Sequence, residues 1–115
     1  MIITGPAKVI TVYIGESDRW KGRPLYSVII EMARKMGLAG ATALKGFEGF
    51  GANSRMHTAS ILRLSSDLPV VIKIIDRHER IDEFLPQLEE MVTGGLITIE
   101  DTIVHKYVAE SSATG

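Results

Sequence analysis

The stretch PVVIKII, residues Pro69–Ile75, predicts a central strand of a β-sheet. It is rich in β-branched residues, which favour strands. Because successive side chains of a strand point to opposite faces, Lys73 alone interrupts two otherwise apolar faces. A strand that is apolar on both faces is typical of the middle of a sheet. Proline is tolerated at the first position of a strand, so Pro69 fits its beginning.

Three further segments carry strand-like sequence. In the first segment, side chains alternate between two faces, and Ile10, Val12 and Ile14 share one of them. Gly15 marks the end of this segment. The expected strands are Lys8–Ile14, Ala39–Lys45, and a last strand or small hairpin formed by Leu96–Ile99 and Thr102–Val108, divided at Glu100–Asp101.

Two segments between these strands have apolar residues at helical spacing. The first begins at Pro24, which is tolerated at the first helical position, and ends at Gly37, a typical C-terminal cap. The second covers Glu79–Val92 and contains Pro86, which removes one backbone hydrogen bond. Because its apolar stripe stays in phase across Pro86, we expect one kinked helix.

The resulting order, β-α-β-β-α-β, predicts a ferredoxin-like α+β fold, in which two helices cover one face of a four-stranded antiparallel sheet. The length suits a single domain, residues 1–115, with a flexible tail at 109–115. The uncovered face would carry Val9, Tyr13, Val71, Ile75, Val104 and Val108. Such an apolar patch is usually covered in an oligomer, so we expect self-association.

The composition of the chain excludes several classes of function. Thirteen basic and fourteen acidic residues nearly cancel, so the overall charge does not favour binding to nucleic acid. The absence of cysteine excludes disulfides, thiolate nucleophiles and zinc–sulfur sites. No apolar run reaches the ~18 residues of a membrane span, and no basic segment of a signal peptide precedes the first apolar run. We therefore expect a cytoplasmic protein that does not span a membrane.

The stretch LKGFEGFGANSRMH, Leu44–His57, is the first candidate site. Its glycines allow the backbone to approach a ligand closely, and successive N–H groups can bind an anion. It is neither a P-loop nor a dinucleotide-binding motif, because no Gly-Lys-Ser/Thr and no helix follow. It also begins a connection of over twenty residues, 46–68. Loops of that length are usually functional or mobile, and the pattern leaves both interpretations open.

Other candidate residues give weaker signals. Thr93–Gly95 follows the second helix and is either a helix cap or a phosphate site. Trp20 lies in a basic loop that either packs on the core or anchors an interface. His57, His78 and His105 lack the spacing of metal ligands. We expect neither a metal site nor catalytic residues.

The order of these motifs resembles the PII signal-transduction family over about Lys8–Val108. ALKGFEGFG, Ala43–Gly51, is similar to the strand and Gly-Phe-Gly entry of that family's long T-loop. Asp67–Asp76 is similar to the strand after the loop, and Thr93–Gly95 to the glycine turn called the B-loop. GATALKGFEGFG with RMHT resembles a branch of small, single-domain PII-like proteins, mostly of unassigned function. We refer to Phe47–Leu68 as the arm and to Thr93–Gly95 as the glycine turn.

This resemblance implies a homotrimeric regulator that is not an enzyme. In PII proteins an adenine nucleotide lies in the cleft between adjacent subunits, and the T-loop then alters contacts with a partner, often a membrane transporter or an enzyme. The ligand implied here is AMP, ADP or ATP. By position, the implied nucleotide-binding residues are Gly46, Gly49, Phe50, Gly51, Ala52, Asn53, Gly94, Gly95 and Lys106.

Departures from the family pattern leave the identity of the nucleotide undecided. Ala52–Asn53 stands where the family has Arg-Gln, and Leu96 follows the glycine turn where the family has lysine. With fewer cations, a mono- or diphosphate fits as well as a triphosphate. Gly46-Phe47 and Gly49-Phe50 both fit the Gly-Phe-Gly position.

Two alternatives share the ferredoxin-like fold. One is a trimeric metal-ion tolerance protein of the CutA type, against which the lack of cysteine and the dispersed histidines argue. The other is an enzyme of the acylphosphatase kind, which would use Arg19 or Arg23 in the loop after the first strand.

Overall fold

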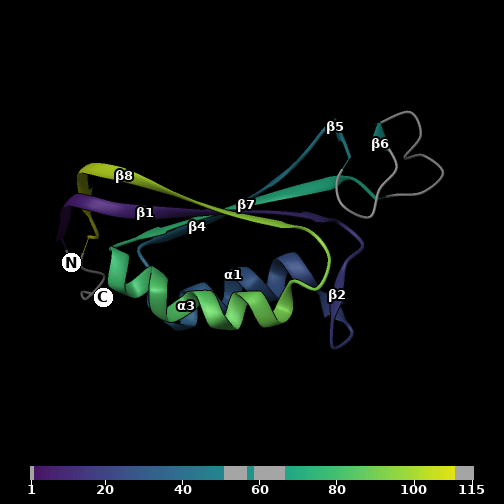
Figure 1. The fold of residues 1–115 in the computed structure, drawn as a ribbon, viewed down its shortest axis with the longest axis horizontal. Coiled ribbons are helices and arrows are strands. Elements are labelled where there is room, and N and C mark those ends of the chain that lie inside the picture. The colour runs from purple at the N-terminus through teal and green to yellow at the C-terminus, as the bar shows by residue number, and fades with distance from the viewer. Residues whose placement is uncertain (1, 51–56, 59–66, 111–115) are drawn as a thin grey trace.

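The computed structural model describes residues 2–50, 57–58 and 67–110. Four strands form one antiparallel sheet in the order β4-β7-β1-β8, and both helices lie on one of its faces (Figure 1). The elements are β1 (Ile2–Gly15), α1 (Leu25–Lys35), β4 (Gly40–Lys45), β7 (Pro69–Asp76), α3 (His78–Met91) and β8 (Leu96–Val108). The predicted ferredoxin-like arrangement is confirmed, and β7 is the central strand that its sequence indicates.

Two short ribbons accompany this sheet. In the first, β2 (Arg19–Trp20) pairs with β3 (Arg23–Pro24) immediately before α1. In the second, β5 (Glu48–Gly49) pairs with β6 (His57–Thr58) at the beginning of the arm. The sequence also allows a short strand or the stem of the arm at 60–64, and these residues fall outside the described part of the chain.

The core lies between the sheet and the two helices. Alternation along β1 and β7 places every second side chain against the helices. The fully buried members are Ile10, Val12, Ile29, Ile72, Ile74, Ile81, Phe84 and Leu88. Gly37 ends α1 as predicted, since its N–H donates to the Arg34 carbonyl and the next N–H, of Leu38, donates to the Ala33 carbonyl, both at 3.0 Å. The second helix continues through Pro86 as one element.

The two long strands differ from their predicted bounds. β1 begins at Ile2 instead of Lys8, because its first residues pair with the end of β8. β8 is continuous, so the predicted division at Glu100–Asp101 is wrong. These two carboxylates lie on an edge strand, where charged side chains can face water without a turn.

The sheet face opposite the helices is uncovered in the single chain. One cross-strand row on this face joins Leu44, Val71, Tyr13 and Leu96, and Val9 and Ile75 form part of another row. This part of the predicted open face is confirmed. The prediction for Val108 is wrong, since a register shift between Ile3 and Gly5 pairs it with Ile2. A bulge of this kind reverses the facing of the residues beyond it.

Candidate functional site

One end of the sheet gathers the segments that the sequence singles out. At this end Gly15 pairs with Pro69, Lys45 pairs with Val70, and Tyr13 pairs with Leu96. The arm, the β1–α1 loop and the glycine turn therefore all begin or end here. Figure 1 shows β5 and β2 at this same end of the molecule.

The arm leaves the sheet through a close backbone contact. The Gly46 N–H donates to the Pro69 carbonyl at 2.6 Å, and a Cβ at Gly46 would lie 2.8 Å from Pro69 Cγ. A side chain at this position would therefore displace the arm from β7. Gly49 meets Pro69 only at an ordinary contact distance. Phe47 and Phe50 lie beside these glycines and are exposed.

The β1–α1 loop is fixed by hydrogen bonds to both of its ends. The Asp18 carboxylate accepts from the Gly15 N–H at 2.9 Å, and the Asp18 carbonyl accepts from the Leu25 N–H at 2.8 Å. Asp67, just before β7, accepts from the Ser17 N–H at 3.0 Å. The loop is thus tied to the beginning of α1 and to the end of the arm.

A small basic hairpin projects from this loop. It turns at Lys21–Gly22, both at positive φ, as tight hairpin turns require. The Lys21 ammonium lies 5.4 Å from the centre of the Trp20 ring, and Trp20 itself packs against the core. This contact supports the interpretation that the basic loop packs on the core. Arg23 pairs with Glu31 of α1, and the hydrogen bond and negative charge of Glu31 raise the pKa of Arg23 above its usual value.

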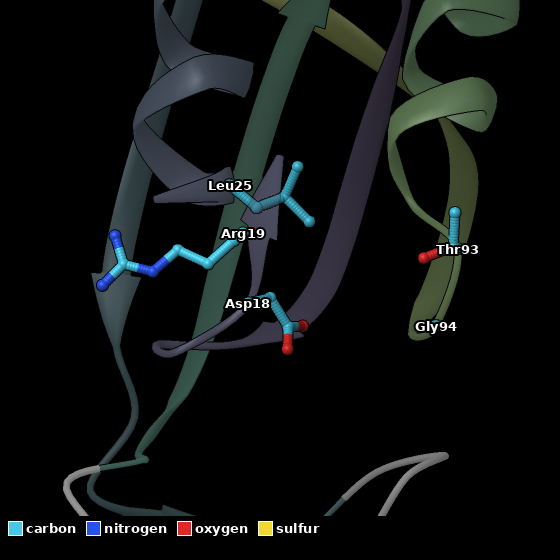
Figure 2. Close-up of a pocket in the computed structure, with 5 residues that line it drawn as sticks. All are labelled: Asp18, Arg19, Leu25, Thr93 and Gly94. Atoms are coloured by element: carbon cyan, nitrogen blue, oxygen red, sulfur yellow. The ribbon is translucent and has the colours of Figure 1, made fainter. Parts of the chain in front are cut away.

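The glycine turn approaches β1 closely. Gly95 has φ +151°, and a Cβ there would lie 2.6 Å from the Tyr13 carbonyl oxygen. Thr93 and Gly94 face the β1–α1 loop across a pocket of about 180 Å³ that Asp18, Arg19 and Leu25 also line (Figure 2). The two glycines of this turn therefore have different roles: Gly95 allows the close approach to β1, and Gly94 borders the pocket.

The structure brings most of the described candidate residues to the same end of the sheet, at its two opposite edges. Gly46, Gly49, Phe50, Gly94 and Gly95 all belong to this end of the sheet. The candidates Gly51, Ala52 and Asn53 lie outside the described residues.

Lys106 lies elsewhere. It is about 33 Å along β8 from Leu96, at ~3.3 Å per residue, next to the register shift where the strand pairing with β1 is irregular. A site within one chain therefore cannot contain both Lys106 and the glycine turn.

Asp18 lines the pocket, although the sequence analysis does not single it out. Its spacing from Gly15 in GESD is a weak sign of a side chain that bonds the backbone of its own loop. Its position opposite the glycine turn depends on the fold, because Asp18 and Thr93 are far apart in sequence.

The described residues offer neither a metal site nor a membrane-spanning helix. Among them, no group of three or more metal-ligating side chains could hold a metal ion. His78 lies 3.6 Å from Asp101, which forms a pair and not a cluster. None of the helices in this part of the chain is long and apolar enough to cross a membrane.

Relatives of the chain fall into one family. Residues 7–104 match the family DUF190, described as "Uncharacterized ACR, COG1993". A UPF0166 protein of Aquifex aeolicus (strain VF5) is 35% identical over 97 residues, 84% of this chain and 91% of that protein. A UPF0166 protein of Methanocaldococcus jannaschii is 38% identical over 101 residues, 87% of this chain and 93% of that protein.

Solved structures with similar folds are PII-like. CPII from Thiomonas intermedia K12, a nitrogen regulatory PII-like protein bound to ADP, AMP and bicarbonate, aligns with TM-score 0.60 and 16% identity, over 89% of this chain and 91% of its own. A PII-like structure from Thermus thermophilus aligns with TM-score 0.63 and 18% identity, over 89% and 92%. At these identities the comparison establishes a common fold. The chain therefore belongs to the DUF190 family and has the PII-like fold.

Proposed function

We propose that this protein is a PII-like regulator that binds an adenine nucleotide and signals through its arm, without catalysing a reaction. The observation that carries the proposal is that the arm and the glycine turn lie at the same end of the sheet, the arm after β4 at one edge and the turn before β8 at the other. The fold is also that of CPII, whose structure contains ADP and AMP. A ligand at this end would touch both a recognition turn and the segment that transmits the signal.

The local chemistry suits a nucleotide with few phosphates. Lys45 ends β4 beside the arm and is paired with Glu16 at 2.7 Å, so part of its charge is already neutralised. Arg23 is likewise paired, with Glu31. Because these cations are engaged, AMP or ADP requires fewer rearrangements than ATP.

We also propose a cytoplasmic homotrimer. The apolar row on the open sheet face gives each subunit a surface that favours association, and a neighbour could bring Lys106 to the glycine turn. The arm would then present its nucleotide-dependent conformation to a partner protein, a transporter or an enzyme.

Equilibrium dialysis of the full chain with AMP, ADP, ATP and cyclic AMP tests the proposal. We expect saturable binding of at least one of the first three at submillimolar concentration, and loss of this binding in Gly94→Val, because Gly94 lines the pocket. Gly40→Ala is the matched control, because its Cβ would meet Ile75 Cγ2 at 3.4 Å, an ordinary contact at the other end of β4. Absence of binding by every nucleotide at millimolar concentration would exclude the proposed function.

A further inference from the structure

The pocket between the β1–α1 loop and the glycine turn has a distinct chemical character. Figure 2 shows the Asp18 carboxylate and the Thr93 hydroxyl turned toward the space between the two segments, whereas the Arg19 guanidinium points away from it. The pocket therefore presents a carboxylate and a hydroxyl, with the side chain of Leu25 on one side. It does not present a free cation to a ligand.

The carboxylate has hydrogen-bonding capacity to spare. Asp18 Oδ2 accepts one bond, from the Gly15 N–H at 2.9 Å, and a carboxylate offers about four acceptor positions. A phosphate in the pocket would be repelled by this charge at short range. A group that donates hydrogen bonds to Asp18 is favoured instead.

The glycine turn supplies the complementary donors. Within the described part of the chain, the backbone N–H groups of Thr93 and Gly94 make no hydrogen bond to another backbone group. Together with the Thr93 hydroxyl they can donate to a ligand oxygen. A ligand group that both donates and accepts would satisfy both walls of the pocket at once, and a pair of neighbouring hydroxyls has this property.

We propose that this pocket holds the ribose hydroxyls of the nucleotide, with Asp18 as their acceptor and the Thr93–Gly94 backbone as donor. This assignment rests on the proposed nucleotide binding and adds the residue that recognises the sugar. A carboxylate that accepts from ribose hydroxyls is also how dinucleotide-binding sheets recognise their cofactor. Leu25 lies beside the sugar, and the phosphates extend away from Asp18.

Comparison of ADP with 2′-deoxy-ADP and 3′-deoxy-ADP by calorimetry tests the assignment. Because a hydrogen bond to a charged group is worth about 1.5–3 kcal/mol, loss of at least one of the two hydroxyls should weaken binding to the natural chain about tenfold or more. In Asp18→Asn the ratio of the affinity for ADP to that for the weaker deoxy analogue should fall below about threefold, since a neutral acceptor makes a weaker hydrogen bond. The asparagine oxygen can still accept from the Gly15 N–H, so the loop stays closed.

Glu16→Gln is the matched control. It removes one negative charge from the same loop, but Glu16 faces Lys45 and does not line the pocket. It should keep the tenfold preference for ADP, even if the overall affinity changes. Equal binding of ADP and both deoxy analogues by the natural chain would overturn the ribose assignment while leaving nucleotide binding in place. Failure of ADP to bind at all would overturn both.

Discussion

At the scale of single residues, the glycines of the site have different roles. The resemblance to PII proteins implies that Gly46, Gly49 and Gly95 all approach a ligand. In the structure, a Cβ at Gly46 would clash with Pro69, and a Cβ at Gly95 would clash with the Tyr13 carbonyl oxygen. Gly49, in contrast, has room for a methyl group. Two of these glycines would therefore be required for folding even if no ligand bound there.

Gly95→Ala should destabilise the protein strongly. Its φ of +151° is unfavourable for alanine, and the new Cβ would lie 2.6 Å from the Tyr13 carbonyl oxygen. Backbone strain of this kind costs about 1–3 kcal/mol, and relief of the clash adds to it. We expect urea denaturation to show a loss of about 3 kcal/mol in the free energy of unfolding. Gly49→Ala should change it by less than about 0.5 kcal/mol, and an equal loss in both variants would contradict the assignment.

The sequence predicts site residues only where a local pattern exists. The glycine-rich stretch and the glycine turn stand out because glycine permits close backbone approach. Asp18 does not, since its role depends on a turn packed across the sheet end. The bond between Ser17 and Asp67 likewise joins residues 50 apart in sequence, which local pattern cannot reveal.

At the scale of elements, periodicity is sufficient for the sheet and the helices. The two-residue period of Lys8–Ile14 and the apolar run at Pro69–Ile75 identify β1 and β7, because one strand face packs on the helices. Periodicity does not predict that β1 extends to Ile2 or that β8 is continuous. Both depend on pairing between the two ends of the chain, so neither strand shows it alone.

Pro86→Ala should stabilise α3. Proline within a helix lacks the N–H that would bond the carbonyl four residues before it, and Pro86 lies at an exposed position inside α3. Alanine restores that donor without removing core contacts. The expected gain in the free energy of unfolding is about 1–3 kcal/mol. Gln87→Ala, the neighbouring exposed position, should give little change, and a loss of stability in Pro86→Ala would show that the helix depends on its proline.

At the scale of the whole molecule, the sheet face opposite the helices leaves large apolar side chains exposed in the single chain. Leu44, Tyr13 and Leu96 remain 55%, 43% and 53% exposed in one cross-strand row. Apolar side chains gathered in this way usually mark an interface. The proposed homotrimer would cover this row.

The double variant Tyr13→Lys, Leu96→Lys should dissociate the oligomer. Two lysines on the open face would be buried and repel their copies in neighbouring subunits. Sedimentation velocity should show a trimer for the natural chain and a monomer for the variant. Ile103→Lys makes a similar change at an exposed position whose pairing with Pro6 places it on the other face, and it should stay trimeric. A natural chain that sediments as a monomer would refute the trimer.

The location of nucleotide binding is the central claim, and amide chemical-shift mapping during an ADP titration tests it most directly. We expect saturable shifts concentrated at Gly46, in the loop Gly15–Asp18 and in the glycine turn, with little change at the C-terminal end of α1, Arg34–Gly37. Unchanged spectra at millimolar ADP would contradict it, as would shifts confined to the C-terminal end of α1.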